Sequence, residues 1–298
     1  MDKDTLKAWF QASRPPFYIA TLIPLTIGWV LAGQEGAWHP WRFLLINAAA
    51  LMVHLATNLA NDYFDYIQGA DDGASIGGSR VIQEGKIAPA ALKKAIISLY
   101  FLAFIVAFYL MITLDLWAMF PVVLFSFCSS LFYVAPPIRY GYHGLGEVFV
   151  GLNMGPIMVV GTYWVIAGRL DWLPFYLSLP VGLMVASILY YQSIPDIDTD
   201  RAIGKRTIAV RLGLKRAKIG LVGFWATIYS AMIALIRAEY LYWPALVGLL
   251  TIPVFIRLLM LLRKTTDTIV MDGYGKYVRI LYFFNGVAMI VSILLQRF

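Results

Sequence analysis

Residues 42–67 have the sequence RFLLINAAALMVHLATNLANDYFDYI, an apolar stretch that carries most of its polar side chains in its last ten positions. A helix needs about 20 residues to cross the hydrocarbon core of a bilayer, and these 26 residues are enough. They are continuously apolar over most of their length, whereas a barrel strand would alternate over about ten residues. The stretch therefore predicts a membrane-spanning helix that ends in a polar segment.

Eight further apolar runs resemble this one, so that nine spans are predicted, at about residues 17–33, 42–67, 91–112, 117–134, 144–167, 173–194, 217–236, 241–262 and 278–296. The chain of 298 residues is 60% hydrophobic and 14% charged, whereas a soluble domain is about a quarter charged. Its single cysteine excludes an intramolecular disulfide. We expect an all-α integral membrane protein of one domain, residues 1–298, with nine transmembrane helices.

Charged residues are distributed unequally between the two ends of these spans. Twenty of the 24 Lys and Arg, and 13 of the 17 Asp and Glu, fall on the side that holds the N-terminus. Positive charge in short loops indicates the cytoplasmic side, so the N-terminus is expected inside and the C-terminus outside. That rule does not account for the acidic residues. We therefore expect a functional site that faces the cytoplasm from the cell (plasma or inner) membrane.

The second span ends in a stripe of oxygen-bearing side chains. Helical spacing of about 100° per residue puts four of them on one face: Asn58, Asn61, Asp62 and Asp65. The sixth span ends similarly, because Asp196 and Asp200 share a face if helical, with Gln192 one turn above. Four spans separate the two segments, so both open on the same side and can face one another.

Carboxylate and amide oxygens are hard ligands suited to Mg²⁺, which commonly bridges one or two carboxylates to substrate phosphates. Basic side chains near both segments could bind the remaining phosphate oxygens: Arg80, Arg139, Lys205 and Arg206. The pattern indicates a magnesium and diphosphate site. The alternative is a pair of solvated helix ends whose carboxylates cap the helix or pair with neighbouring arginines.

The two segments resemble the Asp-rich motifs of the UbiA superfamily of intramembrane prenyltransferases. The first is similar to N-D-x-x-D-x-x-x-G-x-D, with Asn61, Asp62, Asp65, Gly69 and Asp71. The second is similar to D-x-x-x-D, with Asp196 and Asp200. The similarity extends over most of the chain and implies a UbiA-like bundle. Residues 77–85, 140–147 and 196–207 most resemble the 1,4-dihydroxy-2-naphthoate polyprenyltransferases of menaquinone synthesis.

The resemblance implies Mg²⁺-dependent transfer of a polyprenyl group from an allylic polyprenyl diphosphate to an aromatic acceptor, 1,4-dihydroxy-2-naphthoate. It implies two Mg²⁺ ions bound by Asn61, Asp65, Asp196 and Asp200. It implies catalytic roles for Asp62, Asp65, Asp196 and Asp200. It also implies substrate contacts from Asn58, Asn61, Arg80, Arg139, Tyr140, Gln192, Lys205 and Arg206. The lipid bilayer is an expected partner, and nucleic acid is not.

One departure leaves the acceptor open. The naphthoate subfamily has an N-N-x-R stretch before the second motif, whereas this chain has Gln192-Ser193-Ile194-Pro195 and lacks that arginine. A UbiA-type enzyme with another acceptor, such as 4-hydroxybenzoate or homogentisate, is therefore the alternative. A membrane transporter is a remote one, because intramembrane acids also line ion paths, and a lipid-binding scaffold is another. Chain length of the donor, the aromatics that stabilise a carbocation and the oligomeric state stay undetermined.

Overall fold

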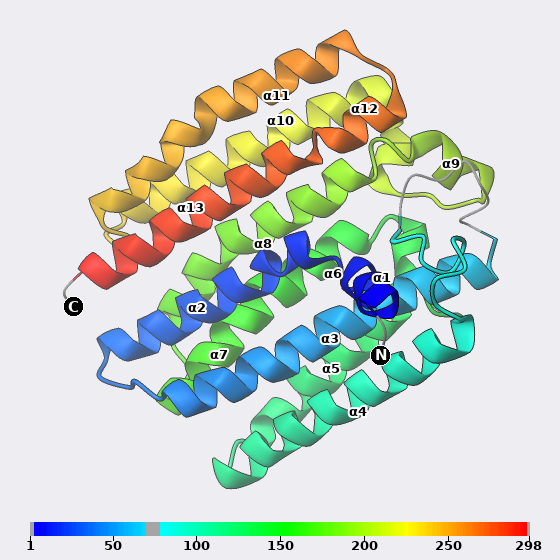
Figure 1. Cartoon of the computed structure of the whole chain (residues 1–298). Helices are drawn as coiled ribbons and strands as arrows, with labels where there is room; N and C mark the ends of the chain where they lie inside the picture. Colours follow the sequence, from blue (N-terminus) through cyan, green and yellow to red (C-terminus); the bar gives the residue numbers. More distant parts are fainter. Residues whose placement is uncertain (1–2, 70–77, 297–298) are drawn as a thin grey trace.

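The computed structural model describes residues 3–69 and 78–296, and every regular element in these ranges is a helix (Figure 1). This confirms the all-α prediction for the described chain. A helix satisfies all its backbone hydrogen bonds within one segment, as a lipid surrounding requires. Asp71, the last residue of the first predicted motif, and Gly77 lie outside the described ranges.

Thirteen α-helices, four 3₁₀ helices and one π-helix follow one another along the described chain. The first are α1 Lys3–Ser13, η1 Pro15–Phe17, α2 Ile19–Gln34, α3 Pro40–Ile67, α4 Pro89–Thr113, η2 Trp117–Met119 and α5 Phe120–Phe132. The middle ones are η3 Tyr140–His143, α6 Gly146–Leu152, the π-helix η4 Asn153–Ile157, α7 Met158–Ala167, α8 Trp172–Gln192 and α9 Ile197–Ala202. The last are α10 Ile208–Arg237, η5 Trp243–Thr251, α11 Ile252–Lys264, α12 Thr268–Gly273 and α13 Gly275–Leu295.

Seven helical segments of the described chain are long and apolar enough to cross a membrane. The bent pair Lys3–Phe17 and Ile19–Gln34, with 53° between its parts, makes an eighth candidate. Trp117–Phe132 is apolar but shorter than 18 residues. These segments coincide in order with the nine predicted runs. By length and composition, however, seven or eight of them qualify as spans, one or two fewer than the nine predicted.

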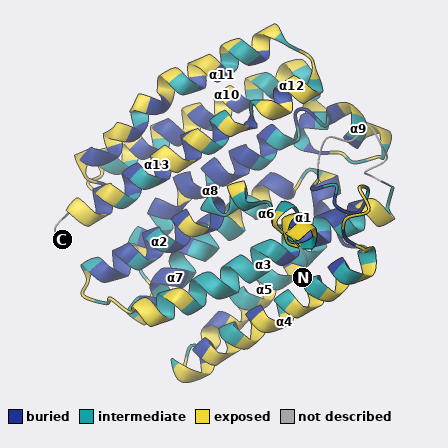
Figure 2. Ribbon diagram, in the orientation of Figure 1, coloured by how far each residue is buried: buried dark blue, intermediate teal, exposed yellow. Residues whose placement is uncertain are grey.

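The outward faces of the bundle are apolar. Leu250, Trp172 and Phe101 are 74%, 71% and 62% exposed, and Figure 2 shows exposed residues along the outer sides of α4, α11 and α13. So many exposed large apolar side chains would be costly in water but are expected where a helix faces lipid. The surface therefore supports the membrane assignment independently of hydropathy.

Two groups of helices form the bundle. In the first, α3 packs along α4, and Leu59 and Leu92 belong to a small core that also takes in α1. In the second, α8 packs against α6, α10 and α13, and Met184 and Trp225 are fully buried in the largest core. The helix α2 contacts α3, α7 and α13. It therefore links the two groups.

The start of α10 differs from the prediction. A short helical turn begins at Ile208, where the Thr207 hydroxyl accepts a hydrogen bond from Val210 N–H at 3.2 Å and caps it. The backbone then breaks at Gly213 (φ 71°, ψ 160°), so the long part of α10 begins after this kink, close to the predicted residue 217. The preceding helix α8 ends at Gln192 rather than 194, and Pro195 lies in the turn before α9. The segment that carries the second motif is therefore a short helix between two turns.

Candidate active site at the charged end of the bundle

One end of the bundle holds α1, residues 78–88, η3 and α9, and we call it the charged end (Figure 1). Asp62 of α3 is buried there, 3% exposed. Its Oδ1 accepts from Ser79 N–H at 3.0 Å and from the Arg14 guanidinium, and its Oδ2 accepts from the Ser79 hydroxyl. Asp62 thus joins α1, α3 and the loop after α3. Through these contacts it positions the end of α3.

The two predicted motifs meet at Lys205. Its Nζ lies 3.2 Å from Asp200 Oδ1 and 5.4 Å from the centre of the Tyr142 ring. The Tyr142 hydroxyl donates to Asp65 Oδ1 at 2.7 Å. Asp65 from the first motif and Asp200 from the second are therefore bridged by one tyrosine and one lysine, and both carboxylates are buried.

Electrostatics favour the charged form of this lysine. Burial lowers the pKa of Lys205, but the neighbouring Asp200 and Asp65 carboxylates outweigh it and raise that pKa overall. Burial and the negative charge of Asp65 raise the pKa of the Tyr142 hydroxyl, which stays protonated and donates to Asp65. Lys205 is thus a cation at neutral pH, and burial raises the pKa of the Asp200 carboxyl against the opposing charge of this lysine.

The second motif folds as one helical turn. Asp196 precedes α9, and its carbonyl accepts from Asp200 N–H at 2.8 Å, so the two residues share a face as predicted. Asp198 lies on the other side, with its side chain 85% exposed, and pairs with Arg201 at 3.1 Å. The structure thereby separates Asp198 from the site.

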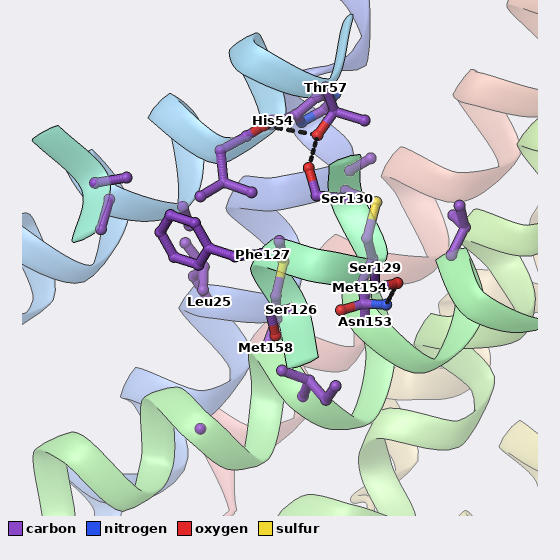
Figure 3. Close-up of a pocket in the computed structure, with 18 of the residues that line it drawn as sticks. Leu25, His54, Thr57, Ser126, Phe127, Ser129, Ser130, Asn153, Met154 and Met158 are labelled. Carbon is purple, nitrogen blue, oxygen red and sulfur yellow. Dashed lines mark hydrogen bonds between the residues drawn. The ribbon is translucent and has the colours of Figure 1, made fainter. Parts of the chain in front are cut away.

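A partly open cavity of about 350 Å³ begins near the charged end. At that end it is lined by Arg14, Asn58, Asn61, Tyr140 and Gln192, four of which are predicted substrate-binding residues. The lining continues to Leu116 and Met119, at the opposite end of α4 and the start of α5, and is mostly apolar. Figure 3 shows part of this wall. A charged mouth above an apolar cavity fits a ligand with an anionic head and a hydrocarbon tail.

The residues present fit a magnesium site that is completed by substrate. No three His, Cys, Asp or Glu side chains of the described residues come together to hold a metal by themselves. However, Asn61 lines the same region, and its Oδ1 is buried without a hydrogen-bond partner among the residues that the structure describes. An unpaired hard oxygen beside Asp65 suits Mg²⁺, which usually takes few protein ligands together with phosphate oxygens and water.

The four predicted basic residues belong to the charged end but do not line the cavity, whose basic lining residue is Arg14. Arg80 and Arg139 adopt left-handed backbone conformations, with φ of 61° and 42°, and Arg14 does so at 51°. A non-glycine residue in this region costs about 1–3 kcal/mol, and such residues concentrate at functional sites. Arg139 donates to Gln68 Oε1 at 2.7 Å and lies over the Tyr142 ring. Arg206 is exposed, and its backbone N–H donates to the Tyr142 carbonyl.

Three residues of this site were not predicted from the sequence. Arg14 and Ser79 bind Asp62, from 48 and 17 positions away in the chain. Glu147 is 5% exposed, and its Oε1 is buried without a partner. A carboxylate in the first turn of an apolar span is costly in lipid and could have drawn attention to Glu147. For Arg14 and Ser79 we find no local signal.

Together these features define an intramembrane helical protein with a charged mouth over an apolar cavity. A sequence model of the UbiA prenyltransferase family matches residues 21–271. The chain belongs to the UbiA prenyltransferase family, and its relatives are named as prenyltransferases. The protein is therefore an enzyme of this class, and the transporter and scaffold alternatives are set aside.

Several relatives have the same kind of name. The 1,4-dihydroxy-2-naphthoate octaprenyltransferase of Bacillus subtilis is 27% identical over 228 residues, 76% of this chain and 73% of that protein. The Escherichia coli protein of the same name is 30% identical over 71% of this chain and 70% of its own length. The 2-carboxy-1,4-naphthoquinone phytyltransferase of Synechocystis is 26% identical over 96% of this chain and 92% of its own.

Solved structures share the fold. A UbiA homologue from Aeropyrum pernix K1 superposes with a TM-score of 0.67 at 20% identity, over 92% of this chain and 98% of that one. A UbiA homologue from Archaeoglobus fulgidus, bound to GPP and Mg²⁺, gives 0.61 at 14% identity, over 95% and 99%. These likenesses confirm the UbiA-like bundle.

The contacts of Asp62 predict a large effect on stability. Replacing it, Asp62→Ala, removes the carboxylate that pairs with the mostly buried Arg14 guanidinium, and breaking a buried pair of this kind costs about 3 kcal/mol of the free energy of unfolding. The exposed pair of Asp198 contributes at most about 1 kcal/mol, so Asp198→Ala is the control. Thermal unfolding in detergent measures both. If the Asp62→Ala protein unfolded at the same temperature as the Asp198→Ala control, the positioning role of Asp62 would be contradicted.

Proposed function

We propose that this protein transfers a polyprenyl group from an allylic polyprenyl diphosphate to an aromatic acceptor at the charged end of the bundle, with Mg²⁺. The observation that carries the proposal is the buried, unpaired Asn61 Oδ1 at the mouth of an apolar cavity, on the same helix as Asp65. A hydrocarbon tail fits the cavity, and a diphosphate fits the mouth. The bound GPP and Mg²⁺ of the Archaeoglobus homologue support this assignment.

The donor head group is held by charge. Arg80, Arg139, Lys205 and Arg206 supply cations for diphosphate oxygens, with Asn58, Tyr140 and Gln192 as further contacts at the mouth. Lys205 is already paired with Asp200, so its position is set before substrate arrives. Preorganised charge of this kind stabilises a leaving group without reorganisation during the reaction.

Two Mg²⁺ ions would be held by Asn61, Asp65, Asp196 and Asp200, and they supply charge neutralisation for the leaving diphosphate. Asp62 keeps the end of α3 in place through Arg14 and Ser79. Asp65 and Asp200 are oriented by Tyr142 and Lys205. Asp65, Asp196 and Asp200 would therefore bind the ions. Asp62 contributes indirectly, because it positions the helix that carries Asp65.

In the reaction, the bond between prenyl C1 and the diphosphate oxygen breaks and its electron pair leaves with diphosphate. A ring carbon of the acceptor then forms a bond to C1. The ring carbon loses a proton, or, for 1,4-dihydroxy-2-naphthoate, carbon dioxide. Aromatic faces that line the cavity near the mouth, among them Tyr140, shield and stabilise positive charge on the prenyl carbon.

We further propose 1,4-dihydroxy-2-naphthoate as the acceptor, in menaquinone biosynthesis. The names of the Bacillus, Escherichia and Synechocystis relatives support a naphthalene acceptor. The replacement of the subfamily's N-N-x-R stretch by residues 192–195 keeps 4-hydroxybenzoate and homogentisate as alternatives. Quinone profiles of a deletion strain separate them: we expect dihydroxynaphthoate to accumulate and menaquinone to disappear. Unchanged menaquinone would exclude the naphthoate.

The transfer reaction predicts a matched set of variants. Purified protein with polyprenyl diphosphate, acceptor and Mg²⁺ should give prenylated product, and EDTA should abolish it. Asp65→Ala and Asp196→Ala should lower kcat at least a hundredfold, because each removes a proposed metal ligand. Asp198→Ala, whose side chain lies outside the site, is the control and should keep activity within threefold.

Two outcomes decide against the assignment. Product formed equally well in EDTA would remove the metal from the mechanism. Equal losses in Asp65→Ala and Asp198→Ala would mean that the motifs matter only for folding.

We also propose nine spans, with α2 and Trp117–Phe132 both crossing, the N-terminus in the cytoplasm and the C-terminus outside. Cysteine accessibility tests this in a Cys128→Ser background. We expect Asp198→Cys to react with a membrane-impermeant maleimide only in inverted vesicles, and Ala238→Cys only in intact cells. The reverse pattern, or labelling of both from one side, is incompatible with this topology.

A further inference from the structure

One acceptor atom in the cavity wall has no donor. Asn153 lines the cavity, and its Nδ2 donates to the Phe149 carbonyl and to Ser129 Oγ, both at 2.8 Å. A backbone carbonyl only accepts hydrogen bonds, so the atom bonded to the Phe149 carbonyl is the amide nitrogen. The amide oxygen, Oδ1, is then the atom that has no partner in these two bonds. No donor in the described chain reaches that oxygen. Figure 3 shows Asn153 beside Ser129 in the wall.

Backbone packing keeps this side chain directed into the cavity. Gly151 and Gly155 lie two residues to either side of Asn153, and both face α8. A Cβ on Gly155 would lie 2.6 Å from Gly182 Cα, so this segment cannot approach α8 with any other face. Residues two apart on a helix point in nearly opposite directions. Asn153 therefore faces away from α8, at the start of the π-helix η4, a type of turn common at functional sites.

A hydrogen-bond chain orients the amide. The Tyr140 hydroxyl donates to the Ser129 carbonyl at 2.8 Å, and Ser129 Oγ lies 3.2 Å from that hydroxyl oxygen. Ser129 Oγ in turn accepts from Asn153. The same residues form an aromatic wall, because the Tyr140 and Phe149 rings are 4.4 Å apart and both line the cavity. A flat ring can lie against this wall within reach of Asn153.

The depth of Asn153 matches that of the reacting end of the donor. Asn153 is seven residues from the start of α6, an axial rise of about 10 Å at 1.5 Å per residue. Asn61 is six residues from the end of α3, about 9 Å by the same measure. Both side chains line one cavity. Asn153 bonds Ser129, and the adjacent Ser130 contacts Thr57, four residues before Asn61 in α3. A group bound at Asn153 therefore lies about one helical turn deeper than Asn61, next to the proposed diphosphate site.

We propose that Asn153 Oδ1 accepts a hydrogen bond from a ring hydroxyl of the aromatic acceptor, whose ring packs on Phe149 and Tyr140. This inference rests on the proposed function and assigns the acceptor's place within it. A prenyl tail has no donor and would bury Oδ1 unpaired, which is unfavourable. A phenol or hydroquinol supplies both the donor and the flat ring. The hydrogen bond also polarises the O–H bond of the acceptor. This raises the electron density of the ring and favours its alkylation.

The test compares Asn153→Ala with Asn47→Ala. Asn47 is half-buried in α3 and donates to the Phe43 carbonyl at 2.8 Å, as Asn153 does to Phe149, but it does not line the cavity. Titration calorimetry with 1-naphthol, in detergent and without donor, measures binding apart from turnover. We expect Asn153→Ala to bind 1-naphthol about tenfold more weakly, the loss of one hydrogen bond. Asn47→Ala should stay within twofold of the unmodified protein.

Two further measurements sharpen the result. Against 1-methoxynaphthalene, which cannot donate, the unmodified protein and Asn153→Ala should bind alike. In the transfer assay, the acceptor KM should rise about tenfold in Asn153→Ala while the donor KM stays within twofold. If Asn153→Ala does not fold, Asn153→Ser should show a smaller loss in the same direction.

The outcomes separate this inference from the proposed function. Prenyl transfer with unaltered 1-naphthol affinity and acceptor KM in Asn153→Ala overturns the acceptor site and leaves the function standing. Asn153-dependent binding of 1-naphthol without any transfer supports the ring site and overturns the function. A rise in donor KM equal to that in acceptor KM also overturns the inference, because Asn153 would then contribute to binding of the prenyl donor as much as of the acceptor.

Discussion

Ionised side chains in an apolar bundle persist only where opposite charges or hydrogen-bond donors meet them. Lys205 forms an ion pair with Asp200, and the Tyr142 hydroxyl donates a hydrogen bond to Asp65. Arg14 and Ser79 do the same for Asp62. These contacts draw α1, α3, η3 and α9 together at one end. The position of the charged end, and with it the mouth of the cavity, follows from this need for partners.

The cavity depends on the same arrangement. Its lining passes from Arg14 and Asn61 at the charged end to Leu116 and Met119 at the other, so polar and apolar chemistry lie along one path. Close packing of glycines on α8 brings the helix that carries Asn153 near enough to close one wall. An amphiphilic donor and a hydroxyl-bearing ring can therefore occupy adjacent places along this path. This geometry suits a reaction that joins a lipid to an aromatic molecule.

Sequence patterns predicted the parts whose cause is local. Helical spacing put Asn58, Asn61, Asp62 and Asp65 on one face, and α3 is helical through all of them. The four-residue spacing of Asp196 and Asp200 likewise predicted one face, and Asp198 is indeed turned out to solvent. The short helical turn of residues 208–212, before the Gly213 kink in α10, was missed, because the Thr207 cap depends on one hydroxyl inside a run of basic residues that looked like a loop.

By itself, the sequence determined the helical membrane fold, the unequal division of charge and the two acidic motifs, because each follows from composition or from spacing along one helix. Only the tertiary structure decided that Tyr142 and Lys205 bridge the motifs, that Arg14 pairs with Asp62, and that Asn153 opens into the cavity. Those contacts join residues as far as 77 positions apart, as between Tyr142 and Asp65. Such pairings arise from how helices pack, which no local periodicity encodes.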